Sequence, residues 1–193
     1  MKKSVIVLIV IGVILLIGFA FYRNVYNTEV KLNQQVKKQW ANVESSYQRR
    51  ADLIPNLVNT VKGYADFEKS TLTQVIEARA KATSVNINAE NLTPETFQQF
   101  QQAQDGLSSA LSRLMVVVER YPELKANQNF LELQAQLEGT ENRINVERNR
   151  FNEAVESYNS FTLRFLVHIL FKFEEKPYFK ANEGTDVVPT VEF

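Results

Sequence analysis

The chain has 193 residues, and its 22 lysines and arginines balance its 22 aspartates and glutamates, so its formal net charge is zero. A nucleic-acid-binding protein needs a basic excess to displace counterions, and this balance argues against that class. The chain has no cysteine and only one histidine, His168. Disulfides, thiolate catalysis, thiol-ligated metals and a metal site built from several histidines of one chain are therefore excluded.

The N-terminal region has the pattern of a membrane anchor. Two lysines precede the 17 apolar residues of Val5–Phe21, and Tyr22 and Arg23 follow them. At about 1.5 Å per residue this run spans roughly 26 Å, near the lower limit for crossing a bilayer. Aromatic and basic residues after such a run are typical of the membrane interface. We therefore expect a single transmembrane anchor over residues 1–23 that contacts the lipid bilayer through residues 5–22.

A cleaved signal peptide is the alternative, because Gly18 and Ala20 have the spacing that a signal peptidase accepts. The apolar run is longer than a usual signal core and continues directly into helix-compatible sequence, which favours an uncleaved anchor. Positive charges on both flanks give no clear orientation. The short N-terminal flank resembles a signal anchor, so we expect a single-pass protein of the bacterial inner membrane with most of the chain outside the cytoplasm.

The rest of the chain has the composition and periodicity of long helices. It is rich in helix-forming residues, and the whole chain has only six glycines and five prolines. Between residues 26 and 158 apolar side chains recur at spacings of three and four, which predicts amphipathic helices in a bundle. Thr93-Pro94 forms a capped helix start, Tyr121-Pro122 ends that helix, and another helix begins near Asn127.

Pro55 leaves two interpretations of the first body helix. In one, residues 23–81 form a single kinked helix. In the other, the chain turns at residues 50–52, where Arg49 and Arg50 suit a helix C-terminus and Asp52 can cap the next helix. The break gives four segments of about 28, 29, 27 and 34 residues, which suit an up-and-down bundle. We favour the break, although the apolar pattern continues through Pro55.

The sequence therefore predicts an all-α protein, with a single N-terminal transmembrane helix followed by an antiparallel, four-helix, up-and-down bundle of long amphipathic helices. We expect the bundle over residues 24–173 and an irregular C-terminal tail over residues 174–193. Trp40 and Tyr47 are seven residues apart on one face, and we expect them in the core of the bundle rather than at an oligomer contact.

Motifs spread over nearly the whole chain carry a resemblance to one protein family. The longest are Arg49-Arg50-Ala51-Asp52-Leu53-Ile54-Pro55-Asn56-Leu57-Val58, Tyr121-Pro122-Glu123-Leu124-Lys125-Ala126-Asn127 and Leu137-Glu138-Gly139-Thr140-Glu141-Asn142-Arg143-Ile144. Shorter ones are Lys62-Gly63-Tyr64, Glu77-Ala78-Arg79, Phe130, Glu147-Arg148, Phe151-Asn152, Tyr158-Asn159 and the ending from Lys176-Pro177-Tyr178-Phe179 to Pro189 and Phe193. With these motifs the chain resembles the LemA family. It departs near Phe165-Leu166, where the family usually has Phe-Pro.

The resemblance implies a bacterial single-pass membrane protein with a helical-bundle body and no established enzymatic activity. Some members of the family are encoded near membrane metalloproteases. The family offers no catalytic residues that could be placed on this sequence.

The stretch Phe161–Phe173 is a candidate membrane-interface segment. Arg164, His168 and Lys172 recur in it every four residues, so that on a helix they would form one basic stripe. The apolar residues beside this stripe are Phe165, Leu166, Ile169, Leu170 and Phe173. A basic stripe with an apolar remainder is typical of an interfacial helix. The alternative is a segment that packs on the bundle with only its stripe in water, and the sequence leaves both open.

Arg49, Arg50 and Asp52 form a second candidate set, for a partner or an anionic ligand. A charge set that fixes a helix turn explains them more simply, because a guanidinium pair without a concave pocket is weak evidence for a site.

The sequence predicts no catalytic residue, no cofactor and no metal ligand. It has no glycine-rich nucleophile or phosphate motif, so we expect no enzymatic activity. We expect a membrane-anchored scaffold or interaction protein of the bacterial cell envelope, whose partner is a second copy or another envelope protein and not nucleic acid. The alternative is a membrane-tethered sensor or ligand-binding receptor, which would need a cavity lined by convergent polar groups.

Overall fold

The structure is a computed structural model that describes residues 3–63, 68–85, 87 and 92–180. Every regular element in these ranges is a helix, in the order α1 (Lys3–Lys62), α2 (Lys69–Ser84), α3 (Pro94–Val118), α4 (Pro122–Lys125), α5 (Gln128–Thr162) and α6 (Phe165–Phe171). The predicted all-α class is confirmed. The part of the expected tail from residue 181 onward lies outside the described residues.

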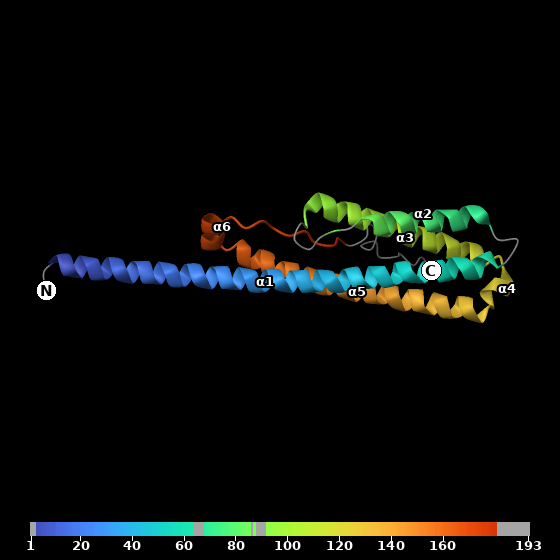
Figure 1. Cartoon of the computed structure of the whole chain (residues 1–193), viewed down its shortest axis with the longest axis horizontal. Coiled ribbons are helices and arrows are strands. Elements are labelled where there is room, and N and C mark those ends of the chain that lie inside the picture. The colour runs from blue at the N-terminus through green and yellow to red at the C-terminus, as the bar shows by residue number, and fades with distance from the viewer. Residues whose placement is uncertain (1–2, 64–67, 86, 88–91, 181–193) are drawn as a thin grey trace, which may run out of the picture.

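Helix α1 is the longest element and determines the shape of the molecule. It has 60 residues, which at about 1.5 Å per residue makes it roughly 90 Å long. Its first third extends alone beyond the other helices (Figure 1). From Val25 onward it buries a stripe of side chains at spacings of three and four, including Val36, Trp40 and Val43. One helix therefore connects the apolar N-terminal run to the packed body.

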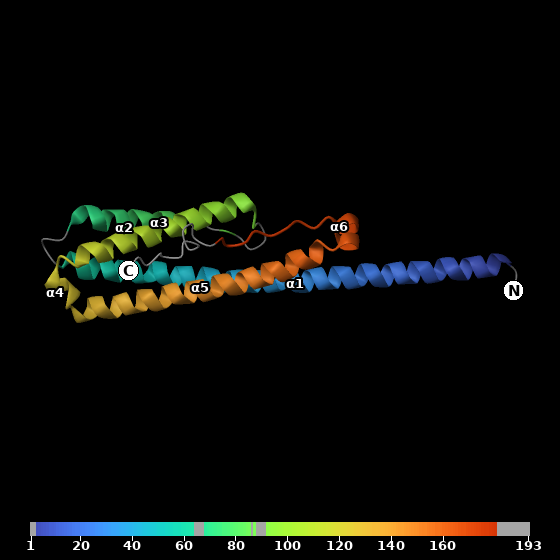
Figure 2. The same cartoon turned by 180° about the vertical axis from the view of Figure 1, so that it is seen from behind.

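The body consists of two antiparallel helix pairs. Helix α1 packs along α5, α2 packs along α3, and contacts between α1 and α2 join the pairs. In chain order α1, α2, α3 and α5 run alternately up and down the long axis (Figures 1 and 2). Helix α4 lies at the distal end, farthest from the apolar run, and α6 lies at the proximal end beside α1. The segments are not matched in length, because α2 has 16 residues and α5 has 35.

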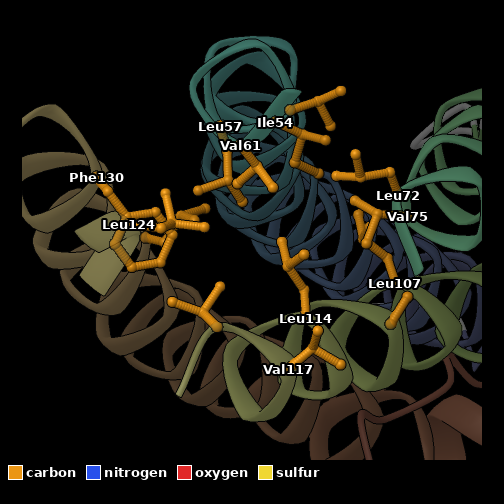
Figure 3. Packing of buried hydrophobic residues seen from close by; sticks show 14 of the residues in the cluster. Ile54, Leu57, Val61, Leu72, Val75, Leu107, Leu114, Val117, Leu124 and Phe130 are labelled. Carbon is orange, nitrogen blue, oxygen red and sulfur yellow. The ribbon is translucent and has the colours of Figure 1, made fainter. Parts of the chain in front are cut away.

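The core is a series of apolar clusters along this axis. In the distal cluster, side chains from α1, α2 and α3 point toward one another, and Leu124 and Phe130 lie beside them (Figure 3). In the middle, the Trp40 ring lies 5.2 Å from Phe100, 5.6 Å from Phe151 and 5.9 Å from Phe97, between ring centroids. Trp40 and Tyr47 therefore lie in the core, as predicted, and other helices of the same chain cover them.

The predicted break at residues 50–52 is wrong, because α1 continues through Pro55. Proline has no N–H to donate to the carbonyl of Ala51, one helical turn earlier. Arg79 of α2 replaces that donor, since its Nε donates to the Ala51 carbonyl at 2.8 Å. The carbonyl is thus satisfied without a break in the helix. The alternative single helix to residue 81 is not found either, because α1 ends at Lys62, directly before Gly63.

This explanation makes a prediction about Arg79 and Pro55. We expect Arg79→Leu to lower the free energy of unfolding by about 1–3 kcal/mol, because it leaves the Ala51 carbonyl without a donor. The loss should be smaller in a Pro55→Ala background, where position 55 regains its own N–H. Chemical unfolding of the four proteins of this double-mutant cycle measures the coupling. Lys81→Leu, at an exposed site of the same helix, is the control. Equal losses in both backgrounds would contradict the explanation.

The two helix starts predicted at Thr93-Pro94 and near Asn127 agree with the structure. The Thr93 hydroxyl accepts from the N–H of Thr96 at 3.3 Å, and Pro94 occupies the first turn of α3. The Asn127 side chain accepts from the N–H of Phe130 at 3.1 Å and caps α5. Both caps satisfy N–H groups that have no partner inside the helix.

Candidate functional site

The N-terminal part of α1 is the first element of the candidate site. Its large apolar side chains are exposed from Val5 to Phe21. In the described part of the chain, α1 is the one helix long and apolar enough to cross a membrane, by length and composition. Tyr22 and Tyr26 follow the apolar run, one turn apart, with stacked rings 6.4 Å between centroids. These tyrosines have the position that interfacial aromatic residues take in membrane proteins.

Helix α6 lies against α1 just beyond this run. Val167 is buried and packs in one cluster with Val25 and Phe161. The ring of Phe171 stacks on Tyr22 at 5.6 Å between centroids. These contacts fix α6 at the level of α1 where the apolar run ends.

Apart from His168, the rest of α6 is apolar and exposed. Positions two apart on a helix differ by about 200° in direction, so Phe165 and Ile169 lie on the side opposite Val167. These two residues, with Leu166 and Leu170, are between 56% and 76% exposed. The structure therefore brings the four apolar residues together on one free surface beside α1. We call these four residues the α6 apolar face.

The predicted basic stripe is only partly found. The stretch 161–173 is not one helix, because α5 ends at Thr162 and α6 begins at Phe165. Arg164 precedes α6, and Lys172 follows it in a left-handed conformation with φ 49°. The Arg164 guanidinium lies over the ring of Phe161, 5.4 Å from its centroid. Arg164, His168 and Lys172 are nevertheless all exposed at this end of the body.

The second predicted set, Arg49, Arg50 and Asp52, is separated by the structure. Arg49 and Asp52 are exposed on the surface of α1, where Asp52 accepts from the side chain of Gln48 at 2.7 Å. Arg50 is 2% exposed and points into the body. The turn that these charges were expected to fix does not exist, since α1 runs straight past them.

Arg50 is the centre of a buried polar network. One terminal nitrogen, Nη1, donates to Ser108 Oγ at 2.7 Å and to Glu141 Oε2 at 2.8 Å. The other, Nη2, donates to Gln104 Oε1 at 2.8 Å and to its carbonyl at 3.2 Å. The amide of Gln104 donates in turn to the Ala82 carbonyl at 3.3 Å. The network thus connects α1, α2, α3 and α5.

The environment of this network changes two ionisable groups. Burial raises the pKa of the Tyr47 hydroxyl, whose ring lies under the Arg50 guanidinium at 5.1 Å. Partial burial raises the pKa of Asp105, with Arg148 and Arg50 acting in the opposite direction. The nearby Glu141 carboxylate also raises the pKa of both groups.

The chain after α6 is held on α5 by two asparagines that the sequence analysis named only within family motifs, without a structural role. Asn159 donates to the Lys176 carbonyl and accepts from its N–H, both at 2.9 Å. Asn152 donates to the Phe179 carbonyl at 3.0 Å and accepts from its N–H at 2.9 Å. Asn152 and Asn159 are seven residues apart on α5, and Lys176 and Phe179 are three residues apart in the extended segment. Both separations span about 10 Å, so each asparagine lies opposite its partner. Two asparagines one heptad apart were the available signal.

Phe179 closes the middle of the core from this segment. Its ring lies 4.6 Å from Phe97, 5.5 Å from Phe151 and 6.2 Å from Trp40. The guanidinium of Arg148 covers the same ring at 4.7 Å, and its Nη2 donates to the Lys180 carbonyl at 2.9 Å. The beginning of the predicted tail is therefore part of the body.

A polar cluster lies between this segment and the proximal end. The Tyr158 hydroxyl donates to Glu29 at 3.4 Å, and the Lys176 ammonium lies 4.9 Å from the centre of the Tyr158 ring. Burial, with the neighbouring Glu29 carboxylate, raises the pKa of Tyr158 to about 12. Burial lowers the pKa of Lys176. These contacts connect α1, α5 and the extended segment.

The described residues hold no group of three or more potential metal-binding side chains. A depression of about 470 Å³ lies between α2 and α3 near the distal end, beside Ser70, Ser112 and Arg113. A smaller cavity of about 120 Å³ lies beside Trp40 and Tyr47.

The class that these observations define is an all-helical body carried on one long helix, whose free end is apolar and long enough to cross a membrane. The LemA family model matches residues 39–193, which is most of the chain. The chain belongs to the LemA family.

The individual relatives that match this chain share about a quarter of its residues in the aligned regions. The chain is similar to Magnetosome protein MamQ 2 of Paramagnetospirillum magneticum, with 27% identity over 173 residues that cover 81% of this chain and 63% of that protein. It is similar to Magnetosome protein MamQ of Magnetospirillum gryphiswaldense, with 26% identity over 153 residues, 69% of this chain and 56% of that protein. Protein LemA of Metamycoplasma hominis is 24% identical over 149 residues, 76% of this chain and 64% of that protein. The chain thus spans less than two thirds of each of these relatives.

Proposed function

We propose that this chain is a membrane-anchored helical scaffold, without enzymatic activity, that presents its body to partners in the bacterial cell envelope. The observation that supports this most directly is the continuity of α1. The apolar run Val5–Phe21 and the core stripe from Val25 to Val61 belong to one helix. A helix that enters the bilayer without a joint would hold the body in a defined direction.

The contacts along α1 make it suitable as a rigid support. Arg79 satisfies the carbonyl that Pro55 leaves free, and Arg50 connects α1 to the neighbouring helices in the middle of the body. From Tyr22 to Lys62 the helix covers roughly 60 Å. The distal end, with α4, would therefore lie at a fixed height above the membrane, where it can meet a second copy or another envelope protein.

The side of the membrane is a further part of this proposal. We propose that the body lies outside the cytoplasm of a bacterial inner membrane, as in a signal anchor, and this assignment rests on the sequence alone. Protease accessibility in spheroplasts and in lysed cells tests it. The body should be digested in intact spheroplasts, whereas digestion only after lysis would place it in the cytoplasm.

Cross-linking in intact membranes tests the scaffold itself. Because the chain has no cysteine, single cysteines can be placed at exposed apolar sites such as Val116, Leu131 and Val146. We expect discrete cross-linked products from at least one of these body sites. Leu8→Cys, in the proposed membrane span, reports contacts within the bilayer separately. A protein that stays monomeric and without partner at every body site would contradict a scaffold.

A further inference from the structure

We propose that α6 is a second membrane element: an interfacial helix whose apolar face enters the bilayer surface beside α1 and whose basic neighbours contact anionic lipid headgroups. The inference rests on the proposed function, since it requires the N-terminal part of α1 to lie in lipid. The occupant of the α6 apolar face is thus the bilayer of that same anchor, and not a protein partner.

The height of α6 relative to the membrane follows from α1. A hydrocarbon core of about 30 Å takes about 20 helical residues, and the apolar run Val5–Phe21 supplies 17. Counted from Val5, the core therefore ends near Asn24. Phe171 stacks on Tyr22, and Val167 packs with Val25. The level of α6 thus coincides with the edge of the hydrocarbon core.

The α6 apolar face points away from the protein, which leaves it free to contact lipid. Val167 and Phe171 turn toward α1, whereas Phe165, Leu166, Ile169 and Leu170 are left uncovered. Other large apolar side chains exposed in the described body, such as Val116 and Leu131, are spread over separate helices. Isolated exposed apolar residues are ordinary, but a contiguous apolar face marks a contact surface. Helix α6, which carries this face, lies at the proximal end of the body, next to the part of α1 that extends alone (Figures 1 and 2).

Charge distinguishes a lipid surface from a purely apolar partner. Arg164, His168 and Lys172, on or directly beside α6, are all exposed, and so is Arg23, which follows Tyr22 on α1. Basic side chains at the edge of an apolar surface are the arrangement by which interfacial helices bind anionic membranes. With α1 across the bilayer and α6 in its surface, the body would be fixed in rotation as well as in tilt, which a single spanning helix cannot achieve.

The full-length chain in lipid nanodiscs tests this directly. A nitroxide label is placed at Ile169→Cys, and its collisions with oxygen, which enters lipid, are compared with those of a water-soluble nickel chelate. Leu8→Cys is the membrane reference, and Val116→Cys, at a 70% exposed site on α3, is the water reference. We expect an oxygen-to-nickel ratio at position 169 that is several-fold above that at position 116.

A ratio at position 169 equal to that at position 116 would overturn the proposal. So would a label shielded from both reagents, because it would show a protein cover, such as a second copy, in place of lipid. Leu8→Cys distinguishes the two proposals. If the oxygen-to-nickel ratio is high at position 8 and low at position 169, α1 is anchored in lipid and only the proposal for α6 fails.

The lipid composition tests the charge contribution. The ratio at position 169 should be higher in nanodiscs with phosphatidylglycerol than in phosphatidylcholine alone. Arg164→Gln with Lys172→Gln should remove most of this difference, since each basic group near an anionic surface adds a few-fold to binding. No dependence on phosphatidylglycerol in the unmodified chain would overturn the headgroup part of the proposal.

Discussion

Replacing Arg50 with alanine is expected to lower the free energy of unfolding of the body by about 3–5 kcal/mol, one of the two largest effects of any single substitution considered for this chain. The change removes the donor on which Ser108, Gln104 and Glu141 converge. It leaves polar oxygens without partners and a cavity between three helices. Chemical unfolding followed by the emission of Trp40, the one tryptophan of the chain, measures the loss.

Arg49 supplies a matched control for this experiment. It is the same residue type one position earlier on α1, but its side chain is exposed. Arg49→Ala should therefore change the stability by no more than about 0.5 kcal/mol. Equal effects of the two substitutions would mean that the network of Arg50 contributes little. Glu141 is 46% exposed, so Glu141→Gln should cost much less than Arg50→Ala, because water and Gln104 still serve the guanidinium.

Phe179→Ala is expected to have the second large effect, a loss of about 3–5 kcal/mol, because it empties the centre of an aromatic cluster. Phe179 is 5% exposed and contacts rings from α1, α3 and α5. The same substitution should loosen the extended segment on α5. Unfolding of the body measures the first effect, and the rate of trypsin cleavage at Lys172 and Lys180 measures the second.

Tyr178→Ala is the control for Phe179→Ala. Tyr178 is the adjacent aromatic residue and is 41% exposed, so its removal should leave stability and cleavage rates nearly unchanged. If the two substitutions have similar effects, the segment 174–180 lies loosely on the body and the asparagine contacts do not hold it.

The sequence predicted the elements whose signals are local. The apolar run, the cap at Thr93-Pro94 and the cap at Asn127 depend on neighbours within one turn, and the structure shows the helices that they indicate. The apolar pattern also placed Trp40 and Tyr47 in the core. A regular pattern of this kind identifies the buried face of a helix, but not which helix covers it.

The sequence failed where a distant side chain decides the outcome. Pro55 with Arg49, Arg50 and Asp52 has the local features of a helix end. The apolar pattern continues through Pro55, and the position of Arg79 in space shows which donor replaces the missing N–H. The contacts of Asn152 and Asn159 also join residues far apart in the chain, so the spacing of the two asparagines does not show which segment they bind. The stretch 161–173 was identified as apolar and basic, but it is not one helix. Because α5 ends at Thr162 and α6 begins at Phe165, Arg164 and Lys172 lie outside α6 and only His168 lies within it.

Several residues that carry the family resemblance make these long-range contacts. Arg50, Arg79, Asn152, Asn159 and Phe179 each connect different helices or fix the extended segment on α5. Their arrangement explains these motif residues as requirements of one fold.

The distance between two spin labels on α1 tests the continuous helix most directly. Asn24→Cys and Asn59→Cys are both exposed sites in a chain that has no other cysteine. An unbroken helix separates them by about 53 Å along its axis. Pulsed dipolar spectroscopy of the full-length protein in nanodiscs should give a single distribution near this value. A maximum near 30 Å, the separation that a chain reversal around residue 51 would produce, would contradict the account.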